Sequence, residues 1–63
     1  MFTPSFLILR DKIKNATSLG ELDRIAVSLN RQYSAGQLTV FELKKLDDLY
    51  IKKYESIKDR EES

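Results

Sequence analysis

Apolar residues recur at steps of three and four along most of the chain, which is the spacing expected of α-helices with one buried face. The first segment carries three such residues, Phe6, Leu9 and Ile13, with charged residues on its other face. Thr3 is a favoured N-cap, and Pro4 stands at the first helical position, where its missing N–H costs nothing. The pattern predicts a short helix over about residues 4–14.

The second segment has its own start and stop signals. Ser18 and Glu21 have the spacing of a capping box, in which the Ser side chain accepts an amide and the Glu side chain reaches back. Gly36 stands where a left-handed residue commonly ends a helix. The pattern predicts a helix over about residues 19–35. Its apolar stripe consists of Leu22, Ile25, Ala26, Leu29 and Tyr33.

The third segment begins with the clearest signal in the chain. Thr39 and Glu42 form another capping box, and Leu38 and Leu43 occupy the two positions of a hydrophobic staple. A helix is expected over about residues 40–58. The charged residues that follow, 59–63, lack apolar partners and are expected to fray.

The short connection between the second and third helices predicts an antiparallel hairpin. We therefore expect one all-α domain over residues 1–63, made of a short N-terminal helix and this hairpin. A chain of 63 residues buries a small core, and without Cys or His it has neither disulfides nor the usual ligands of a structural zinc ion.

The third helix carries more apolar side chains than one neighbouring helix can cover, which favours a homodimer in which hairpins pack into a bundle. The alternative is that the first helix of the same chain covers the surplus. The predicted dimer seam consists of Leu43, Leu46, Tyr50 and Tyr54.

The sequence offers little for catalysis. It lacks His and Cys, which supply the commonest general base, the best nucleophile and the usual transition-metal ligands. Asp47 and Asp48 are adjacent, so on a helix their side chains diverge by about 100°. Ion pairing along a helix, as between Glu42 and Lys45, is the more ordinary role for such charges. We expect no enzyme activity, no cofactor and no metal.

The charges are nearly balanced, with 11 basic and 10 acidic residues. A dedicated phosphate-binding surface normally shows a clear basic excess, so direct binding to nucleic acid is disfavoured. A transcription modulator that acts on DNA directly, or through a nucleoid protein, is the alternative. Phe41, with Lys44 and Lys45, lies off the dimer seam and is the candidate for an external contact with another protein.

The apolar runs are too short for a secretory signal or a membrane span, so we expect a cytoplasmic protein without a membrane partner.

From residue 16 to residue 57 the chain reads ATSLGELDRIAVSLNRQYSAGQLTVFELKKLDDLYIKKYESI. This stretch, together with the length and the lack of Cys and His, resembles the very short accessory proteins encoded between the exo and xis genes of lambdoid phages. The resemblance implies a small helical protein made early in infection, which biases the lysis–lysogeny choice or host cell-cycle behaviour. It also implies that the protein acts in the bacterial host through a host or phage protein partner.

A fainter resemblance is to the Hha/YmoA modulators, which bind the nucleoid protein H-NS rather than DNA. It is carried by Phe6-Leu7 ahead of Arg10, by SLGELDRI from Ser18, and by Leu38 with Glu42. That family's Ala-Asp-His-Arg stretch and its C-terminal Trp are missing here, so no functional residue is carried over from it.

Overall fold

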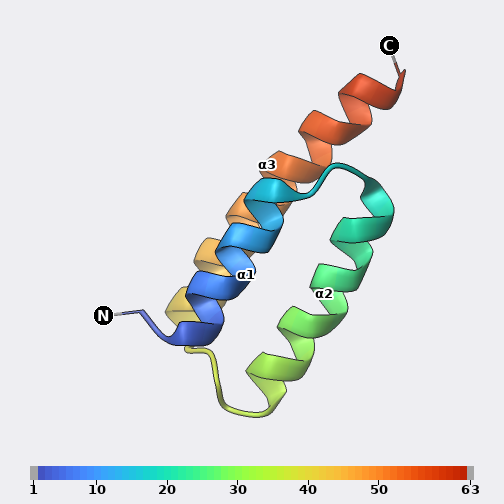
Figure 1. The fold of residues 1–63 in the computed structure, drawn as a ribbon. Helices are drawn as coiled ribbons and strands as arrows, with labels where there is room; N and C mark the ends of the chain where they lie inside the picture. Colours follow the sequence, from blue (N-terminus) through green and yellow to red (C-terminus); the bar gives the residue numbers. More distant parts are fainter. Residues whose placement is uncertain (1, 63) are drawn as a thin grey trace.

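The structure, a computed structural model, describes residues 2–62. It contains three helices, α1 (Pro4–Asn15), α2 (Leu19–Ser34) and α3 (Val40–Glu62). The chain runs up, down and up, so that α1 and α3 lie side by side in the same direction and α2 is antiparallel to both (Figure 1). The predicted all-α fold is confirmed. α1 packs against both helices of its own chain, which is the arrangement that the sequence left as the alternative to pairing between chains.

α1 begins at the predicted cap. The Thr3 hydroxyl accepts the N–H of Phe6 at 3.2 Å, and Pro4 is the first helical residue. The helix ends at Asn15, one residue beyond the predicted end. The three residues predicted for its apolar face are all buried, namely Phe6, Leu9 and Ile13.

α2 begins with a capping box that differs from the prediction in one bond. The Ser18 hydroxyl accepts the N–H of Glu21 at 3.2 Å, as expected. The Glu21 carboxylate reaches one residue further back than expected, because it accepts the Thr17 hydroxyl at 2.9 Å. Both bonds satisfy polar groups at the helix start, where intrahelical partners are missing.

The C-terminal end of α2 closes in a Schellman motif. Gly36 has a φ of 78°, which a residue with a side chain rarely adopts. The N–H of Gln37 donates to the Gln32 carbonyl at 2.9 Å, and the N–H of Gly36 donates to the Tyr33 carbonyl at 3.0 Å. The left-handed residue is where the sequence predicted it.

The core lies where the three helices meet. It includes Leu46, which the sequence pattern assigned to the dimer seam. Leu46 is 0% exposed within a single chain, because α1 and α2 cover it. It is therefore a core residue of the monomer and has no surface left for a partner. The buried apolar residues are Phe6, Leu9, Ile13, Ala16, Leu22, Ile25, Leu29, Leu38, Leu46 and Ile57.

α3 is longer than the sequence predicted. It continues to Glu62, so residues 59–62, expected to fray, are helical, and Ser63 lies outside the described residues. Its last turns extend beyond α1 and α2 (Figure 1). Residues 58–62 contain no Gly or Pro, and adding a turn to an existing helix needs no new nucleation. The extension therefore requires no packing partner.

Candidate protein-interaction surfaces

Glu42 joins the N-terminal ends of α1 and α3. Its Oε1 accepts the N–H of Thr39 at 3.0 Å and completes the predicted capping box, in which the Thr39 hydroxyl accepts the N–H of Glu42 at 3.1 Å. Its Oε2 accepts both the N–H of Thr3, at 2.7 Å, and the Thr3 hydroxyl, at 3.0 Å. One carboxylate thus caps α3 and fixes the start of α1 against it, which the sequence did not predict.

These hydrogen bonds stabilise the ionised form of Glu42. The bond from the Thr39 amide contributes most to lowering the pKa of the carboxyl below its ordinary value, and burial opposes this shift. The predicted ion pair between Glu42 and Lys45 does not form, because the carboxylate is occupied by the two caps. Lys45 turns instead toward aromatic rings.

An aromatic cluster surrounds the Lys45 ammonium group. The Phe2 and Phe6 rings are stacked with centroids 4.3 Å apart. Lys45 Nζ lies 5.8 Å from the Phe2 centroid and 5.0 Å from the Phe41 centroid, within the range of cation–π attraction. Phe41 is 62% exposed. Two of the residues predicted for an external contact, Phe41 and Lys45, therefore lie together, while Lys44 is exposed outside this cluster.

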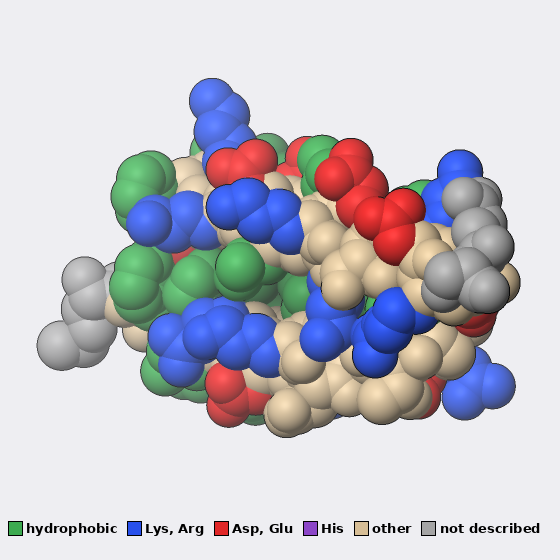
Figure 2. All heavy atoms as spheres, turned by 90° about the horizontal axis from the view of Figure 1, so that it is seen from above, with side chains coloured by type: hydrophobic (Ala, Val, Ile, Leu, Met, Phe, Trp, Pro, Cys, Tyr) green, Lys and Arg blue, Asp and Glu red, His purple; other side chains and the backbone are tan. Residues whose placement is uncertain are grey.

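A groove lies between α1 and α3, and no residue of α2 lines it. It consists of two adjoining hollows of about 380 and 240 Å³ that share Lys14 and Leu49. Figure 2 shows hydrophobic side chains with Lys and Arg side chains on both sides of them. The apolar lining residues of this α1–α3 groove are Phe2, Phe6, Ile13 and Leu49, and the basic ones are Arg10, Lys14, Lys45, Lys52 and Lys53.

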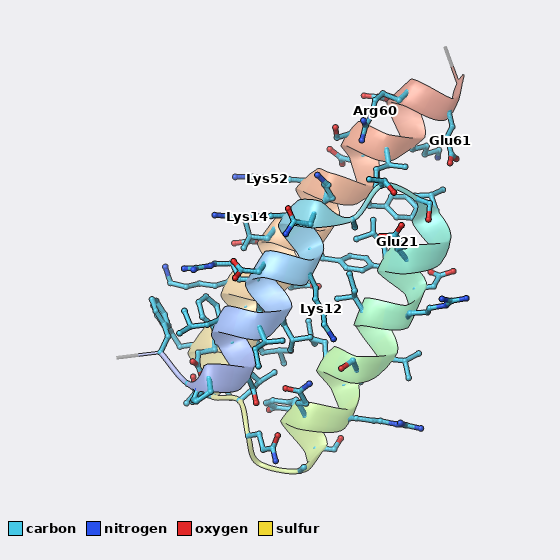
Figure 3. All side chains as sticks on the ribbon, viewed as in Figure 1. Lys12, Lys14, Glu21, Lys52, Arg60 and Glu61 are labelled. Atoms are coloured by element: carbon cyan, nitrogen blue, oxygen red, sulfur yellow. The ribbon has the colours of Figure 1, made fainter. Side chains whose placement is uncertain are left out.

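The cations of the groove come from both helices. Lys14 of α1 and Lys52 of α3 extend toward the same side of the molecule (Figure 3). Lys53 is half-buried, and its Nζ donates to the Lys14 carbonyl at 2.8 Å, at the end of α1 where carbonyl groups lack helical partners. Arg10 Nε lies 3.8 Å from Asp11 Oδ1, is shielded from solvent and makes no hydrogen bond within the described residues.

A second apolar surface, the tyrosine face, lies on α3 and consists of Tyr50, Ile51 and Tyr54. The two tyrosine rings are stacked with centroids 6.4 Å apart. A hollow of about 390 Å³ is lined by these three residues together with Glu55 and Lys58. Burial raises the pKa of Tyr50, and the nearby Asp23 carboxylate adds to this shift.

The four residues of the predicted dimer seam thus differ in how far they are exposed. Tyr54 is exposed, and Tyr50 and Leu43 are half-buried and pack against the core, whereas Leu46 is wholly inside the chain. What is left of the seam for a partner is the tyrosine face, widened by Ile51, which is 48% exposed.

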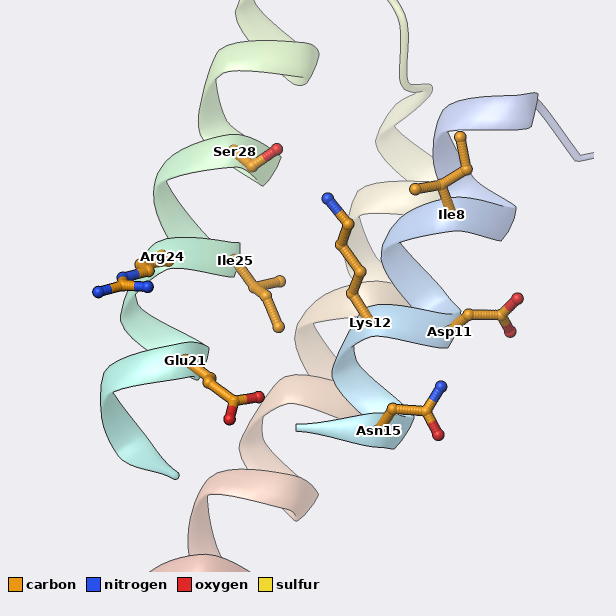
Figure 4. Close-up of a pocket in the computed structure, with 8 residues that line it drawn as sticks. All are labelled: Ile8, Asp11, Lys12, Asn15, Glu21, Arg24, Ile25 and Ser28. Atoms are coloured by element: carbon orange, nitrogen blue, oxygen red, sulfur yellow. The ribbon is translucent and has the colours of Figure 1, made fainter. Parts of the chain in front are cut away.

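A further hollow, of about 570 Å³, lies between α1 and α2 (Figure 4). Lys12 extends across it from α1, and Ile25 forms part of its wall. The Glu21 carboxylate on its far side is already engaged in the cap with Thr17. Its charges alternate in sign and do not converge on one point. The charged lining residues are Asp11, Lys12, Glu21 and Arg24.

Within residues 2–62, no three His, Cys, Asp or Glu side chains gather in a way that could hold a metal ion. None of the helices described has the length and apolar character needed to cross a membrane.

Comparisons of the chain with known proteins identify no related protein. No protein-family model matches the chain, and neither the curated proteins nor the solved structures contain a match.

Proposed function

We propose that this protein is a small, non-enzymatic regulatory protein that acts by binding another protein and that forms a homodimer. The observation that supports this most strongly is the apolar surface left over after all three helices have packed together. Exposed hydrophobic side chains that gather in patches usually mark contact sites. On α3, Phe41 is exposed beside Lys45, and Ile51 and Tyr54 are exposed on the tyrosine face.

The tyrosine face suits a contact between two copies of the chain. A two-fold dimer brings the same patch of each copy together, so a patch must be complementary to itself. Glu55 and Lys58 flank the apolar residues of this face. In an antiparallel pairing of two α3 helices, Ile51 of each copy can pack against Tyr54 of the other, with the charged residues at the rim of the contact.

The biological setting belongs to the same proposal through the resemblance of the sequence to the exo–xis accessory proteins. We expect the protein to act in the cytoplasm of a bacterial host and to bias the lysis–lysogeny choice or host cell-cycle behaviour. The lack of His and Cys supports a role without catalysis.

Two measurements test the proposal. Tagged protein captured from its bacterial host, with and without nuclease, should retain one stoichiometric protein partner in both cases. Light scattering of the purified protein should give twice the mass of one chain. A single-chain mass at millimolar concentration would rule out the homodimer, and a capture without any stoichiometric protein would rule out the regulatory contact.

The cations of the α1–α3 groove favour one alternative, a nucleic-acid-associated transcription modulator. Its direct form predicts binding that weakens steeply with salt and that depends on four lysines, namely Lys44, Lys45, Lys52 and Lys53. Absence of a mobility shift with any duplex at low salt would exclude that form. Recovery of the captured partner that depends on DNA would instead support it.

A further inference from the structure

We infer that the α1–α3 groove binds an acidic amphipathic helix of a partner protein. This inference rests on the proposed function and names the chemistry of the segment that the partner contributes. It is carried by three properties of the groove, namely its charge, its apolar base and its length.

The charge of the groove differs from that of the whole molecule. The chain has a formal net charge of +1. The residues that line the groove include five cations and one carboxylate, that of Asp48. Arg10 is among them, with its Nε shielded from solvent and 3.8 Å from Asp11 Oδ1. Carboxylates are the protein groups that a fork-shaped guanidinium and several ammonium groups bind most strongly.

The base of the groove is apolar, so the segment it binds needs apolar side chains of its own. Leu49 lies at the junction of the two hollows, with Phe2 and Phe6 toward one end and Ile13 toward the other. A helix that places apolar residues at steps of three and four matches such a row. Its flanking positions then carry acidic residues toward Lys14 on one rim and Lys52 on the other (Figure 3).

The length of the groove matches about three helical turns. Its lining residues on α3 run from Lys45 to Ser56. At a rise of about 1.5 Å per residue this stretch is roughly 16 Å long. A partner helix of about 11 to 14 residues would cover it. Placed there, it would lie against α1 and α3 on the side that α2 leaves open and would complete a four-helix arrangement.

Nucleic acid fits the same groove less well. Single strands bind basic grooves by stacking bases on aromatic faces. Here the Phe2 ring is stacked on Phe6, and the Lys45 ammonium lies over both Phe2 and Phe41. Part of the ring surface that a base would stack on is therefore already in contact with other groups. Phosphates set over Leu49 and Ile13 would lose water without gaining a polar partner from the base of the groove.

The test is a titration of the isotope-labelled full chain, followed by nuclear magnetic resonance. The probes are a helical peptide of about 14 residues with a leucine stripe flanked by glutamates, the same peptide with lysines in place of the glutamates, and an oligothymidylate. We expect the acidic peptide to shift the amide signals of Arg10, Lys14, Leu49 and Lys52. Raising the salt from 50 to 300 mM should weaken its binding about tenfold, because the contact is ionic.

A matched pair of variants assigns the site. Lys14→Glu with Lys52→Glu reverses one charge on each rim, and Lys12→Glu with Lys44→Glu makes the same change in net charge outside the groove. The first pair should weaken peptide binding about tenfold or more, because each reversed rim charge turns an attraction for a glutamate into a repulsion. The second pair should weaken it less than about threefold, because these charges lie outside the groove. Circular dichroism melting of both variants separates a loss of binding from a loss of folding.

The inference is overturned by binding of the lysine peptide as tight as that of the glutamate peptide, by equal losses in the two variants, or by preference for the oligothymidylate. Peptide-induced shifts confined to Ile51 and Tyr54 would also overturn it, because they would place the contact on the tyrosine face. None of these results would contradict the proposed function by itself. That function is contradicted only if the tagged protein retains no stoichiometric protein partner after nuclease treatment.

Discussion

Leu46→Ala distinguishes a core residue of the monomer from a residue of a dimer seam. Leu46 is 0% exposed within one chain, so the substitution removes a wholly buried side chain and leaves a cavity. Such changes cost about 2–5 kcal/mol. A domain of 63 residues has a total stability of roughly 3–9 kcal/mol, at about 0.05–0.15 kcal/mol per residue. We therefore expect Leu46→Ala to remove about a fifth or more of the free energy of unfolding.

Thermal and urea unfolding, followed by circular dichroism at several protein concentrations, measures this effect. A loss of about 3 kcal/mol corresponds to a melting temperature lowered by roughly 12–24 °C in a domain of this size. The size of the loss should not change with protein concentration, because the contacts that Leu46 makes are within one chain.

Two further variants serve as controls. Leu46→Met nearly conserves volume and should cost less than about 1.5 kcal/mol, which provides a folded comparison if Leu46→Ala unfolds completely. Ile51→Ala, on the same helix but at a position 48% exposed, should cost less than about 1 kcal/mol. A loss for Leu46→Ala that is small, or that disappears at high protein concentration, would refute the placement of Leu46 in the core.

Three other predictions follow from named contacts. Glu42→Gln should lower the melting temperature at pH 7, because a neutral amide accepts the Thr3 and Thr39 hydrogen bonds less strongly than a carboxylate. Folding lowers the pKa of Glu42 below its ordinary value of 4.5. The ionised side chain therefore contributes its full stabilisation above about pH 4.5, and this contribution is lost as the pH falls through the folded pKa. An acid titration of stability should show this loss in the wild type and not in the Gln variant. Gly36→Ala should cost about 1 kcal/mol in urea unfolding, entirely from its φ of 78°, because no atom lies within 4 Å of the added carbon; an unchanged midpoint would contradict the left-handed cap. Ile51→Asp should leave the melting temperature of the dilute protein nearly unchanged and halve the mass measured by light scattering; a mass still equal to two chains would exclude the tyrosine face as the dimer contact.

The sequence by itself determined most of the local structure. All three helices start at the residues predicted from Thr3, Ser18 and Thr39, and α2 ends at Ser34, two residues before the left-handed Gly36. These signals are readable because a cap is made by residues within a few positions of one another. The apolar face of α1 was also predicted correctly, because on a short amphipathic helix the apolar face and the buried face coincide.

The predicted seam on α3 was less accurate, and the reason is packing. The apolar side chains of this helix exceed what α2 alone can cover, and periodicity gives no information on which element covers the rest. The structure shows that α1 buries Leu46 together with α2, and it leaves Ile51 and Tyr54 exposed. The choice between core and interface thus depended on where the first helix packs, which is decided by tertiary contacts.

The candidate site was predictable in part. Phe41 and Lys45 could be singled out because they are one helical turn apart and lie off the apolar stripe. The residues that α1 contributes to the same groove, Arg10 and Lys14 among them, could not, because they lie more than 25 positions away in the chain. A net charge of +1 averages over the whole molecule and conceals the cations that gather once α1 and α3 lie side by side.

The hydrogen bonds of the Glu42 side chain show the same contrast between what the sequence determines and what the tertiary structure determines. The sequence determined that Glu42 caps its own helix, because Thr39 is three residues away. Only the tertiary structure determined that its second oxygen caps α1 as well, across 39 positions of sequence. Local hydrogen bonds define where each helix begins, whereas burial of the shared apolar surface defines which helices are neighbours and therefore which charges share a groove.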